Sequence, residues 1–380
     1  MARSTKWPWL TAALAGVLAA SAGGWAASSR AAALRRRAPA SNRWGGPLRP
    51  APLVSRGKPV ASQPLGAAVL VDGRYRTEAV WAGGHPTPAH PSWVAIRVGR
   101  GPTRLLLSWT SSHNHDYDDV FYGAPADYRI ETSDDSSDGA DGHWRTEVSV
   151  AGNPVHARAH SFDFAGRRWV RLVVTGLPEK VNRWGLFLDE VDLHDLSGGG
   201  DDVWLFLGDS ITAGVFDRAP AHQPSFAEAV AAAQPGYHPA TIAAGICNAH
   251  IEDLVRRIDQ VLALNPDARV VALGIGSNDN PPAPFRAGLS ELVRRIRAAG
   301  RIPVVARVPF QNKFPFDYVA PLNEVVDQLA GADGLVPGPD LYGYFRAHPE
   351  RIADGIHPDD QGAVEVNRRW ARAVAPLYVP

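Results

Sequence analysis

The stretch VWLFLGDSITAG, residues 203–214, is apolar at its start and turns polar at Asp209 and Ser210. An apolar run of this length is typical of a buried strand, and a helical pattern begins directly after it. A serine at such a strand-to-helix turn projects its hydroxyl into the crevice beyond the sheet. Its backbone N–H, near the helix N-terminus, points at any anion that forms there. The stretch therefore predicts an α/β sheet with a reactive group at its edge.

The rest of the C-terminal half, residues 203–380, repeats this pattern. Four runs are strand-like: VWLFLG, ATIAAG, RVVALGIG and IPVVARV. Helical segments separate them, and in residues 251–264 these apolar residues share one helical face: Leu254, Ile258, Val261 and Leu262. Alternating strands and helices predict a parallel sheet covered on both sides, which binds ligands beyond the carboxyl ends of its strands. Asn278 and Asp279 follow the third strand, so they are expected at the same edge as Ser210.

Ser210 is the candidate nucleophile at that edge. A serine hydroxyl is inert near neutral pH unless a general base takes its proton and a third group orients the base. The segment ADGIHPDDQGAVEVNRRWA supplies His357, with Asp354 three residues earlier in the same loop. An aspartate on one ring nitrogen leaves the other free to accept the serine proton. These three residues therefore predict nucleophilic catalysis.

Four blocks in this half resemble the signature blocks of the SGNH (GDSL) hydrolases, in the family's order. They are GDSI at 208–211, GICNA at 245–249, GSND at 276–279 and DGIH at 354–357. The resemblance covers residues 203 to about 378. It implies a flavodoxin-like three-layer α/β domain, residues 203–380, that hydrolyses an ester through an acyl-enzyme without a cofactor or metal. Transfer of the acyl group to an acceptor other than water is also known in the family.

The resemblance assigns roles position by position. The nucleophile falls on Ser210, the base on His357 and the orienting carboxylate on Asp354. The oxyanion hole falls on Ser210, Asn248 and Asn278, of which Asn278 donates a side-chain N–H. The supporting positions in these blocks are Asp209, Gly245 and Asp279.

The second block departs from the family, because Asn248 stands where the family has glycine. That glycine donates only its backbone N–H, and asparagine is the residue other than glycine that best tolerates a positive φ, so the hole is expected to be intact. Other interpretations remain open. In a purely structural interpretation, Ser210 is a helix N-cap and Asn278-Asp279 is a turn pair. Cys247 is expected to pack rather than react.

The N-terminal half, residues 65–196, has a different pattern. Six runs alternate with period two between glycine, proline, aspartate and serine: WVAIRVG, TRLLLSW, DYRIETS, WRTEVSV, WVRLVVTGL and GLFLDEVDLHDL. No convincing helix lies between them, which predicts an all-β sandwich or jelly roll. LSGGGDD, residues 196–202, then predicts a hinge or linker to the α/β domain.

This sandwich resembles, less specifically, the discoidin or coagulation-factor type C group of galactose-binding-like domains. The resemblance rests on ADYRIETSDDSSDGADGHW and on HSFDFAGRRWVRLVVTGL. It implies that loops at one end bind sugars, and SSHNHDYDDVFYG, residues 111–123, is the candidate. A metal held there by His113, His115, Asp116 and Asp118 is disfavoured, because such runs are usually solvated loops. A spacer domain is the alternative.

The N-terminus, residues 1–27, predicts export. Arg3 and Lys6 precede an apolar run that contains a small-residue pattern at residues 20–22, the layout of a signal peptide. The run is also long enough for an uncleaved membrane anchor, so cleavage stays open. A disordered leader is the alternative. Residues 28–64, rich in alanine, proline and arginine, predict a linker.

Composition adds exclusions. Lysine plus arginine equals aspartate plus glutamate at 39 each, so no overall field favours nucleic acid. Cys247 is the single cysteine, which excludes an intrachain disulfide and a zinc site built from cysteines.

Export, a sugar-binding sandwich and a hydrolase domain together predict a carbohydrate O-acetyl esterase acting on an extracytoplasmic or environmental polysaccharide. Two alternatives stay open. One is a lipase, thioesterase or arylesterase of the same family, and the other is a carbohydrate-binding protein with an inactive hydrolase domain.

Overall fold

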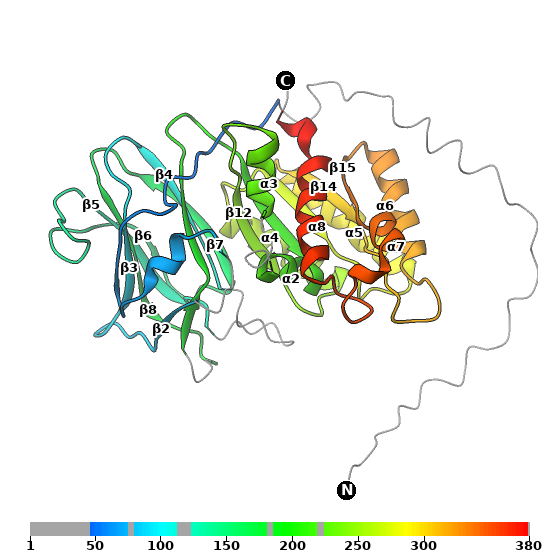
Figure 1. Ribbon diagram of the computed structural model, residues 1–380, viewed down its shortest axis with the longest axis horizontal. Coiled ribbons are helices and arrows are strands. Elements are labelled where there is room, and N and C mark those ends of the chain that lie inside the picture. Colours follow the sequence, from blue (N-terminus) through cyan, green and yellow to red (C-terminus); the bar gives the residue numbers. More distant parts are fainter. Residues whose placement is uncertain (1–45, 75–79, 112–122, 181–184, 219–223, 379–380) are drawn as a thin grey trace, which may run out of the picture. The chain divides into compact units, whose positions relative to one another are not determined.

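Antiparallel strands fill the first part of the chain, and parallel strands alternating with helices fill the second (Figure 1). The computed structural model describes residues 46–74, 80–111, 123–180, 185–218 and 224–378. These residues belong to one compact unit that begins at Gly46. The predicted export signal, residues 1–27, lies outside the described residues.

The second part is built on a five-stranded parallel sheet in the order β12-β11-β13-β14-β15. Its strands are β11 Val203–Gly208, β12 Ala240–Gly245, β13 Val270–Gly274, β14 Ile302–Arg307 and β15 Val336–Asp340. Every residue of β11 and β12 is buried, because helices cover both faces of the sheet. The predicted α/β fold is confirmed.

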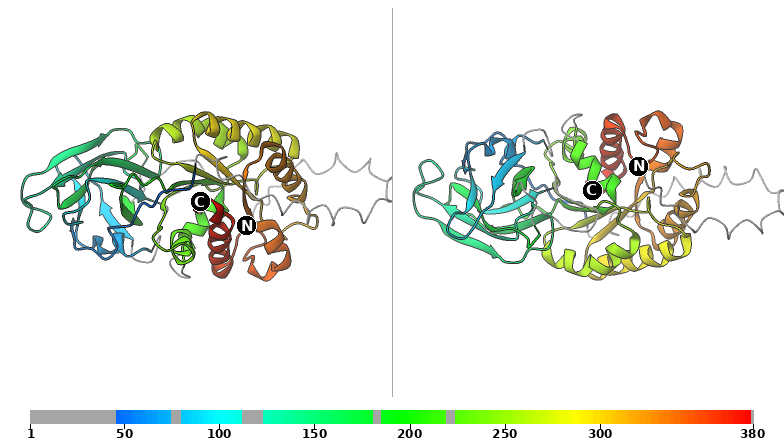
Figure 2. Two further views of the ribbon diagram at one scale, coloured as in Figure 1. Left: turned by 90° about the horizontal axis from the view of Figure 1, so that it is seen from above. Right: turned by 90° about the horizontal axis from the view of Figure 1, so that it is seen from below.

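Seven α-helices and two short 3₁₀ helices accompany this sheet among the described residues. They are α2 Ser210–Arg218, α3 Phe226–Ala233, α4 Ile251–Leu264, α5 Pro282–Ala298, α6 Ala320–Asp333, α7 Leu341–Ala347, η4 Pro349–Arg351, α8 Asp360–Ala373 and η5 Ala375–Leu377. Figure 2 shows α4 and α5, in yellow-green to yellow, on one face of the sheet and α3 and α8, in green and red, on the other. The predicted apolar face of α4 is buried, together with Ile251.

Three glycines lie in one row at the carboxyl end of the sheet. Gly208 pairs with Gly245 on one side and with Gly274 on the other. A Cβ at Gly208 would lie 2.1 Å from Gly274 O, and one at Gly245 would lie 2.4 Å from Ala213 N in α2. Because the row has no side chains, the first turn of α2 packs directly on the strand ends.

The first part of the chain consists of antiparallel sheets around a shared apolar core, consistent with the predicted sandwich. The strand orders are β1-β3-β8-β5-β6, β10-β4-β7 and β2-β9. The elements are β1 Val60–Gln63, η2 Ala67–Val71, β2 Trp81–Gly84, β3 Ser92–Arg97, β4 Arg104–Thr110, β5 Asp127–Ser133, β6 Arg145–Val150, β7 Ala157–Asp163, β8 Trp169–Gly176, β9 Leu186–Leu188 and β10 Glu190–Asp195.

Sequence patterns identified most of these strands but missed β1, β2 and β7. In β7 the buried positions include Ala157 and Ala159, and small side chains carry a weak hydrophobic signal. The short helix η2 was also not expected, since no helical period extends over its five residues.

Part of the predicted linker, residues 28–64, is instead folded. Leu48 N donates to Leu377 O at 2.8 Å, Val54 N donates to Leu193 O at 2.8 Å, and β1 pairs with β3. The predicted hinge at residues 196–202 is also held, because Asp201 Oδ1 accepts from Arg49 N at 2.7 Å. Composition predicted flexibility there, whereas backbone partners from distant segments order both stretches.

The sandwich strand β7 is bonded to the loop that follows α4. Ala159 N donates to Asn265 Oδ1 at 3.1 Å, and Ser161 Oγ donates to Asp267 Oδ1 at 3.1 Å. Asn265 is buried, so this hydrogen bond is protected from water. The sandwich and the α/β part therefore contact each other through specific polar bonds.

Candidate active site

Ser210 is the first residue of α2 and follows the glycine row directly. The preceding Asp209 is fully buried, and its carboxylate accepts from Ile211 N at 3.0 Å and from Ser277 N at 3.1 Å. Burial raises the pKa of Asp209, although these backbone N–H groups oppose the rise. Asp209 thus ties the turn that carries Ser210 to the loop after β13.

The structure brings Ser210, His357 and Asp354 together in one chain of hydrogen bonds. Ser210 Oγ lies 2.8 Å from His357 Nε2, and His357 Nδ1 lies 2.8 Å from Asp354 Oδ2. The His357 side chain keeps 31% of its surface exposed. A neutral imidazole with Nδ1–H toward Asp354 leaves Nε2 able to accept the serine proton.

The loop before α8 sets the spacing of this acid and base. Asp354 Oδ1 accepts from the backbone N–H of Ile356 at 3.0 Å and of His357 at 2.8 Å. Partial burial opposes ionisation of Asp354, but the bonds from His357 and Ile356 outweigh it and hold the pKa of Asp354 below its usual value. The carboxylate therefore stays charged beside the histidine.

Asn248 occupies the position in doubt, and its backbone has the left-handed conformation of a glycine. Its φ of +61° is the only positive φ of a non-glycine residue in the part of the chain that the structure describes. The side chain is exposed, so the backbone conformation does not depend on burying it. Asparagine adopts this region more readily than most residues, which agrees with the expected replacement of a glycine.

Asn278, the other expected oxyanion donor, lies on the turn after β13. Its Nδ2 donates to Ala249 O at 3.0 Å, which links the second and third blocks. An amide nitrogen carries two hydrogens, so one remains for a ligand. Asp279 caps the start of α4 by accepting from Ile251 N at 3.0 Å, and burial raises its pKa. Cys247, on the turn of the second block, is half-buried.

Sequence reasoning missed one loop at this site, residues 308–319 between β14 and α6. Tyr318 OH donates to Ser277 O at 2.7 Å and also contacts Gln311 Oε1. Lys313 N donates to Gly355 O at 3.1 Å, beside Asp354. The sequence could have indicated this loop by its position, because it follows a parallel strand and therefore starts at the same edge of the sheet as Ser210.

The candidate metal ligands of the sandwich, His113, His115, Asp116 and Asp118, lie outside the described residues, as does most of the loop 111–123. Within the described ranges, no three histidine, cysteine or acidic side chains are grouped so as to hold a metal ion. No helix in those ranges is long and apolar enough to cross a membrane.

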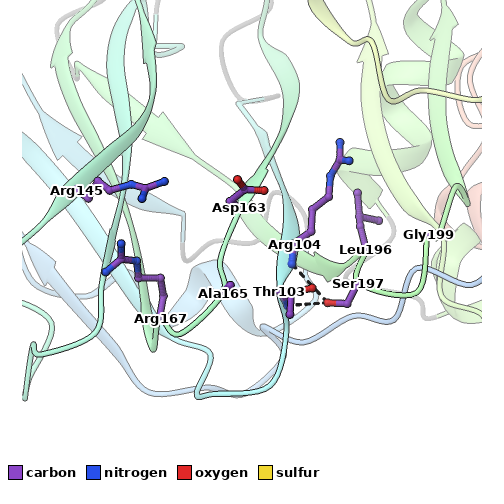
Figure 3. A pocket seen from close by; sticks show the side chains of 9 residues that line it. All are labelled: Thr103, Arg104, Arg145, Asp163, Ala165, Arg167, Leu196, Ser197 and Gly199. Carbon is purple, nitrogen blue, oxygen red and sulfur yellow. Dashed lines mark hydrogen bonds between the residues drawn. The ribbon is translucent and has the colours of Figure 1, made fainter.

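The sandwich also carries a polar groove of about 640 Å³. Its lining residues are Thr103, Arg104, Arg145, Asp163, Ala165, Arg167, Leu196, Ser197 and Gly199. Figure 3 shows Asp163 between Arg145 and Arg104. Arg145 pairs with Glu147 at 2.8 Å and Arg167 with Asp134 at 3.2 Å. These pairs hold both guanidinium groups in place at the groove.

The family of the hydrolase part follows from its sequence. Residues 206–364 match the model of the GDSL-like Lipase/Acylhydrolase family. This part of the chain is therefore a hydrolase domain of the lipase and acylhydrolase class. The match gives residues 206–364 a GDSL-like lipase/acylhydrolase domain, in agreement with the predicted family and enzyme class.

No curated protein matches the chain in sequence. Among solved structures, it is similar to LAE5, an alpha/beta hydrolase enzyme from the metagenome of Lake Arreo, Spain, at 20% identity over 46% of this chain and 95% of that chain, with a TM-score of 0.39. It is similar to a variant of Axe2, an acetyl xylan esterase from Geobacillus stearothermophilus, at 20% identity over 47% and 96%, TM-score 0.39. It is also similar to TesA, at 18% identity over 46% and 99%, TM-score 0.38.

Proposed function

We propose that this ester hydrolase is an exported carbohydrate O-acetyl esterase in which Ser210 is the nucleophile, His357 the general base and Asp354 its orienting partner. The observation that carries the roles is the continuous hydrogen bonding from Ser210 Oγ through His357 to Asp354. Serine nucleophiles in acyl transfer need this order of groups and these distances.

The chemistry proceeds in two balanced steps. Ser210 Oγ attacks the ester carbonyl carbon while its proton passes to His357 Nε2, and the carbonyl oxygen becomes an oxyanion. The backbone N–H groups of Ser210 and Asn248 and the amide of Asn278 are the proposed donors to it. Collapse breaks the bond to the alcohol, which leaves with the proton from Nε2. Water then attacks the acyl-enzyme by the same route and releases the acid.

The carbohydrate part of the proposal draws on the sandwich and on the predicted export signal. The groove around Asp163 offers guanidinium, carboxylate and hydroxyl groups, which are hydrogen-bonding partners for sugar hydroxyls. An exported esterase with a second polar binding surface suits a polymer better than a small soluble ester, because two weak contacts to one chain raise its effective concentration at Ser210.

The proposal is tested by acetate release. Wild-type protein is incubated with acetylated xylan and with ethyl esters of increasing acyl length, and Ser210→Ala serves as the control that lacks the nucleophile. We expect acetate from the polymer and a preference for acetyl over longer acyl groups. Preference for octanoyl or longer esters would favour a lipase or thioesterase instead. Turnover by Ser210→Ala equal to wild type would remove the assigned nucleophile.

The role of the groove is tested separately in the Ser210→Ala background, where bound polymer is not consumed. Arg145→Ala and Arg167→Ala are compared with Arg294→Ala, which removes an arginine paired with Glu291 on the surface of α5. Electrophoresis through gels containing acetylated xylan should show weaker retention for the groove variants only. Equal migration of all three variants would support a spacer role for the sandwich.

A further inference from the structure

Two exposed phenylalanines lie on the loop that joins β14 to α6. Among the described residues, the large hydrophobic side chains that are strongly exposed are Leu65, Phe314 and Phe316, and two of these three share one short loop. Phe314 is 45% exposed and Phe316 is 63% exposed. Burying such a side chain stabilises a fold, so their exposure gives up stability that a purely structural role would have used.

The loop is tied to both halves of the candidate active site. Asn312 N and Lys313 N donate to Gly355 O at 3.0 and 3.1 Å, between Asp354 and His357 in the sequence. At its other end, Tyr318 OH donates to Ser277 O at 2.7 Å, one residue before Asn278. Figure 1 shows this loop, in gold, at the same end of the sheet as the red loop before α8.

The exposed rings are supported by neighbouring aromatic and polar groups. Phe314 and Phe316 are stacked, with centroids 6.1 Å apart and planes inclined by 26°, and Phe314 meets Tyr318 edge-on at 5.5 Å. Asp317, between Phe316 and Tyr318 in the sequence, accepts from Tyr342 OH at 2.6 Å and from Ala320 N at 3.1 Å. The two rings therefore form a preorganised surface, which costs little to order when a ligand binds.

We propose that Phe314 and Phe316 form a subsite that stacks on the apolar C–H face of a sugar ring and so holds an acylated saccharide beside Ser210. This proposal rests on the ester hydrolase function proposed above. It names the part of the substrate that the loop recognises, which is the alcohol side of the ester rather than the acyl chain.

The polar edge of the loop favours a sugar over an alkyl chain. Asn312 and Lys313 are exposed next to the rings and present hydrogen-bond donors, which match the hydroxyls at the rim of a sugar ring. An acyl chain gains most from an enclosed apolar pocket, whereas these rings lie open on a surface bordered by polar side chains. An open aromatic surface with polar neighbours suits a ligand with one apolar face and a polar rim.

The test compares substrates with and without a sugar ring. The variant Phe314→Ala/Phe316→Ala is assayed on acetylated xylo-oligosaccharide, ethyl acetate and ethyl octanoate, none of which has an aromatic ring that could itself stack. We expect the ratio of kcat/KM for the oligosaccharide to that for ethyl acetate to fall about 10-fold, mainly through KM, which corresponds to roughly 1.4 kcal/mol of lost binding. Phe316→Trp should retain the wild-type ratio, because an aromatic face is preserved.

Leu65→Ala is the matched control, since Leu65 is 87% exposed and precedes the sandwich helix η2. It should leave the ratio unchanged. A selective loss on ethyl octanoate would show that the loop recognises acyl chains and would overturn the proposal. An unchanged ratio would overturn it too, and so would an equal fall in kcat on all three esters, because the loop would then act through His357.

Failure of the proposed function is distinguishable from failure of the subsite. If the wild type hydrolyses ethyl acetate but releases nothing from the oligosaccharide, the carbohydrate esterase proposal fails. Binding of unacetylated xylohexaose to Ser210→Ala, with and without the two phenylalanine substitutions, is then measured by calorimetry. Weaker binding in the triple variant supports the subsite, and equal or absent binding in both proteins overturns it.

Discussion

Two regions that each hold histidine and carboxylate side chains differ in burial, with opposite consequences for the pKa of those groups. At the loop before α8, His357 and Asp354 keep 31% and 57% of their side chains exposed, and the pKa of Asp354 is lowered by its hydrogen bonds. On β10, the alternate residues Glu190, Asp192 and His194 are all buried. Burial lowers the pKa of His194 to about 4 and raises that of Glu190 well above its usual value.

The difference shows that a histidine near carboxylates is not thereby a general base, because its exposure to solvent also matters. His194 Nδ1–H donates to Ala51 O, 2.8 Å away, and burial disfavours the charged imidazolium. A general base must gain and lose a proton during turnover, so it needs water or a charge that stabilises its protonated form. His357 has both, through its exposed edge and through Asp354.

Replacing His357 or His194 by alanine should give the largest difference between the two regions, with activity lost in one variant and stability lost in the other. His357→Ala removes the proposed base, so kcat/KM on ethyl acetate should fall on the order of 10⁴-fold with Tm close to wild type. His194→Ala leaves a buried gap and an unpaired Ala51 carbonyl, so it should cost about 1–3 kcal/mol of stability. The activity per folded molecule should persist. Similar losses of activity in both variants would contradict a catalytic role for His357 and a structural role for His194.

The proposed oxyanion donors, Asn248 and Asn278, should give the next largest effect. Asn278→Ala deletes a side-chain donor and should lower kcat about 10²–10³-fold. Asn248→Gly keeps the backbone N–H and relaxes the positive φ, so kcat should change little. Steady-state kinetics of both variants on one small acetyl ester decides this. Comparable losses would mean that the Asn248 side chain itself contacts the substrate or the oxyanion.

Asp354→Asn should have a smaller effect than loss of the histidine. The exposed imidazole can still find the required tautomer through water, so we expect kcat to fall less than in His357→Ala. Asp192→Asn, the matched change on β10, should leave kcat at the wild-type value. For both aspartate variants kcat is measured, and Tm is recorded in parallel. A fall in kcat for Asp192→Asn at unchanged Tm would be contrary to expectation.

The smallest expected effect is a dependence of stability on pH. Burial raises the pKa of Glu190, followed in size by the Asp192 charge, while Arg56 and the Gly73 N–H lower it and Asp72 raises it. Because the folded-state pKa lies above the unfolded value near 4.5, the folded state binds more protons and stability falls as pH rises from about 4.5 through the raised pKa. Glu190→Gln should remove this fall.

We therefore expect Glu190→Gln to match wild type in Tm near pH 4 and to exceed it by about 1–2 °C at pH 8, the shift for about 1 kcal/mol in a protein of this size. Glu291→Gln is the control of opposite sign. Hydrogen bonds from Arg294 and Arg295 lower the pKa of Glu291 to about 2, so its contribution to stability is present above pH 4.5 and is lost as pH falls toward 2. Thermal scans across pH that show the same sign for both variants would refute this account.

Local patterns predicted the elements whose hydrophobic period is strong. The apolar runs of β11, β12, β13 and β14 and the one-sided face of α4 appear in the structure as expected. The edge strand β15, VPGPD, was not expected, because its two prolines remove backbone donors and interrupt any pattern. Pairing with β14 on one side alone allows it to remain a strand.

The sequence by itself determined the class of fold, the four blocks and the positions of Ser210, Asn278, Asp354 and His357, because periodicity and short motifs are local properties of a chain. Only the tertiary structure decided that residues 46–64 are folded and that Phe314 and Phe316 are exposed beside the loop that carries Asp354 and His357. It also decided that His194 is held neutral while His357 retains contact with solvent. Each of these depends on hydrogen bonds and burial between segments far apart in sequence, such as Lys313 with Gly355 and Leu48 with Leu377, and no local pattern records such contacts.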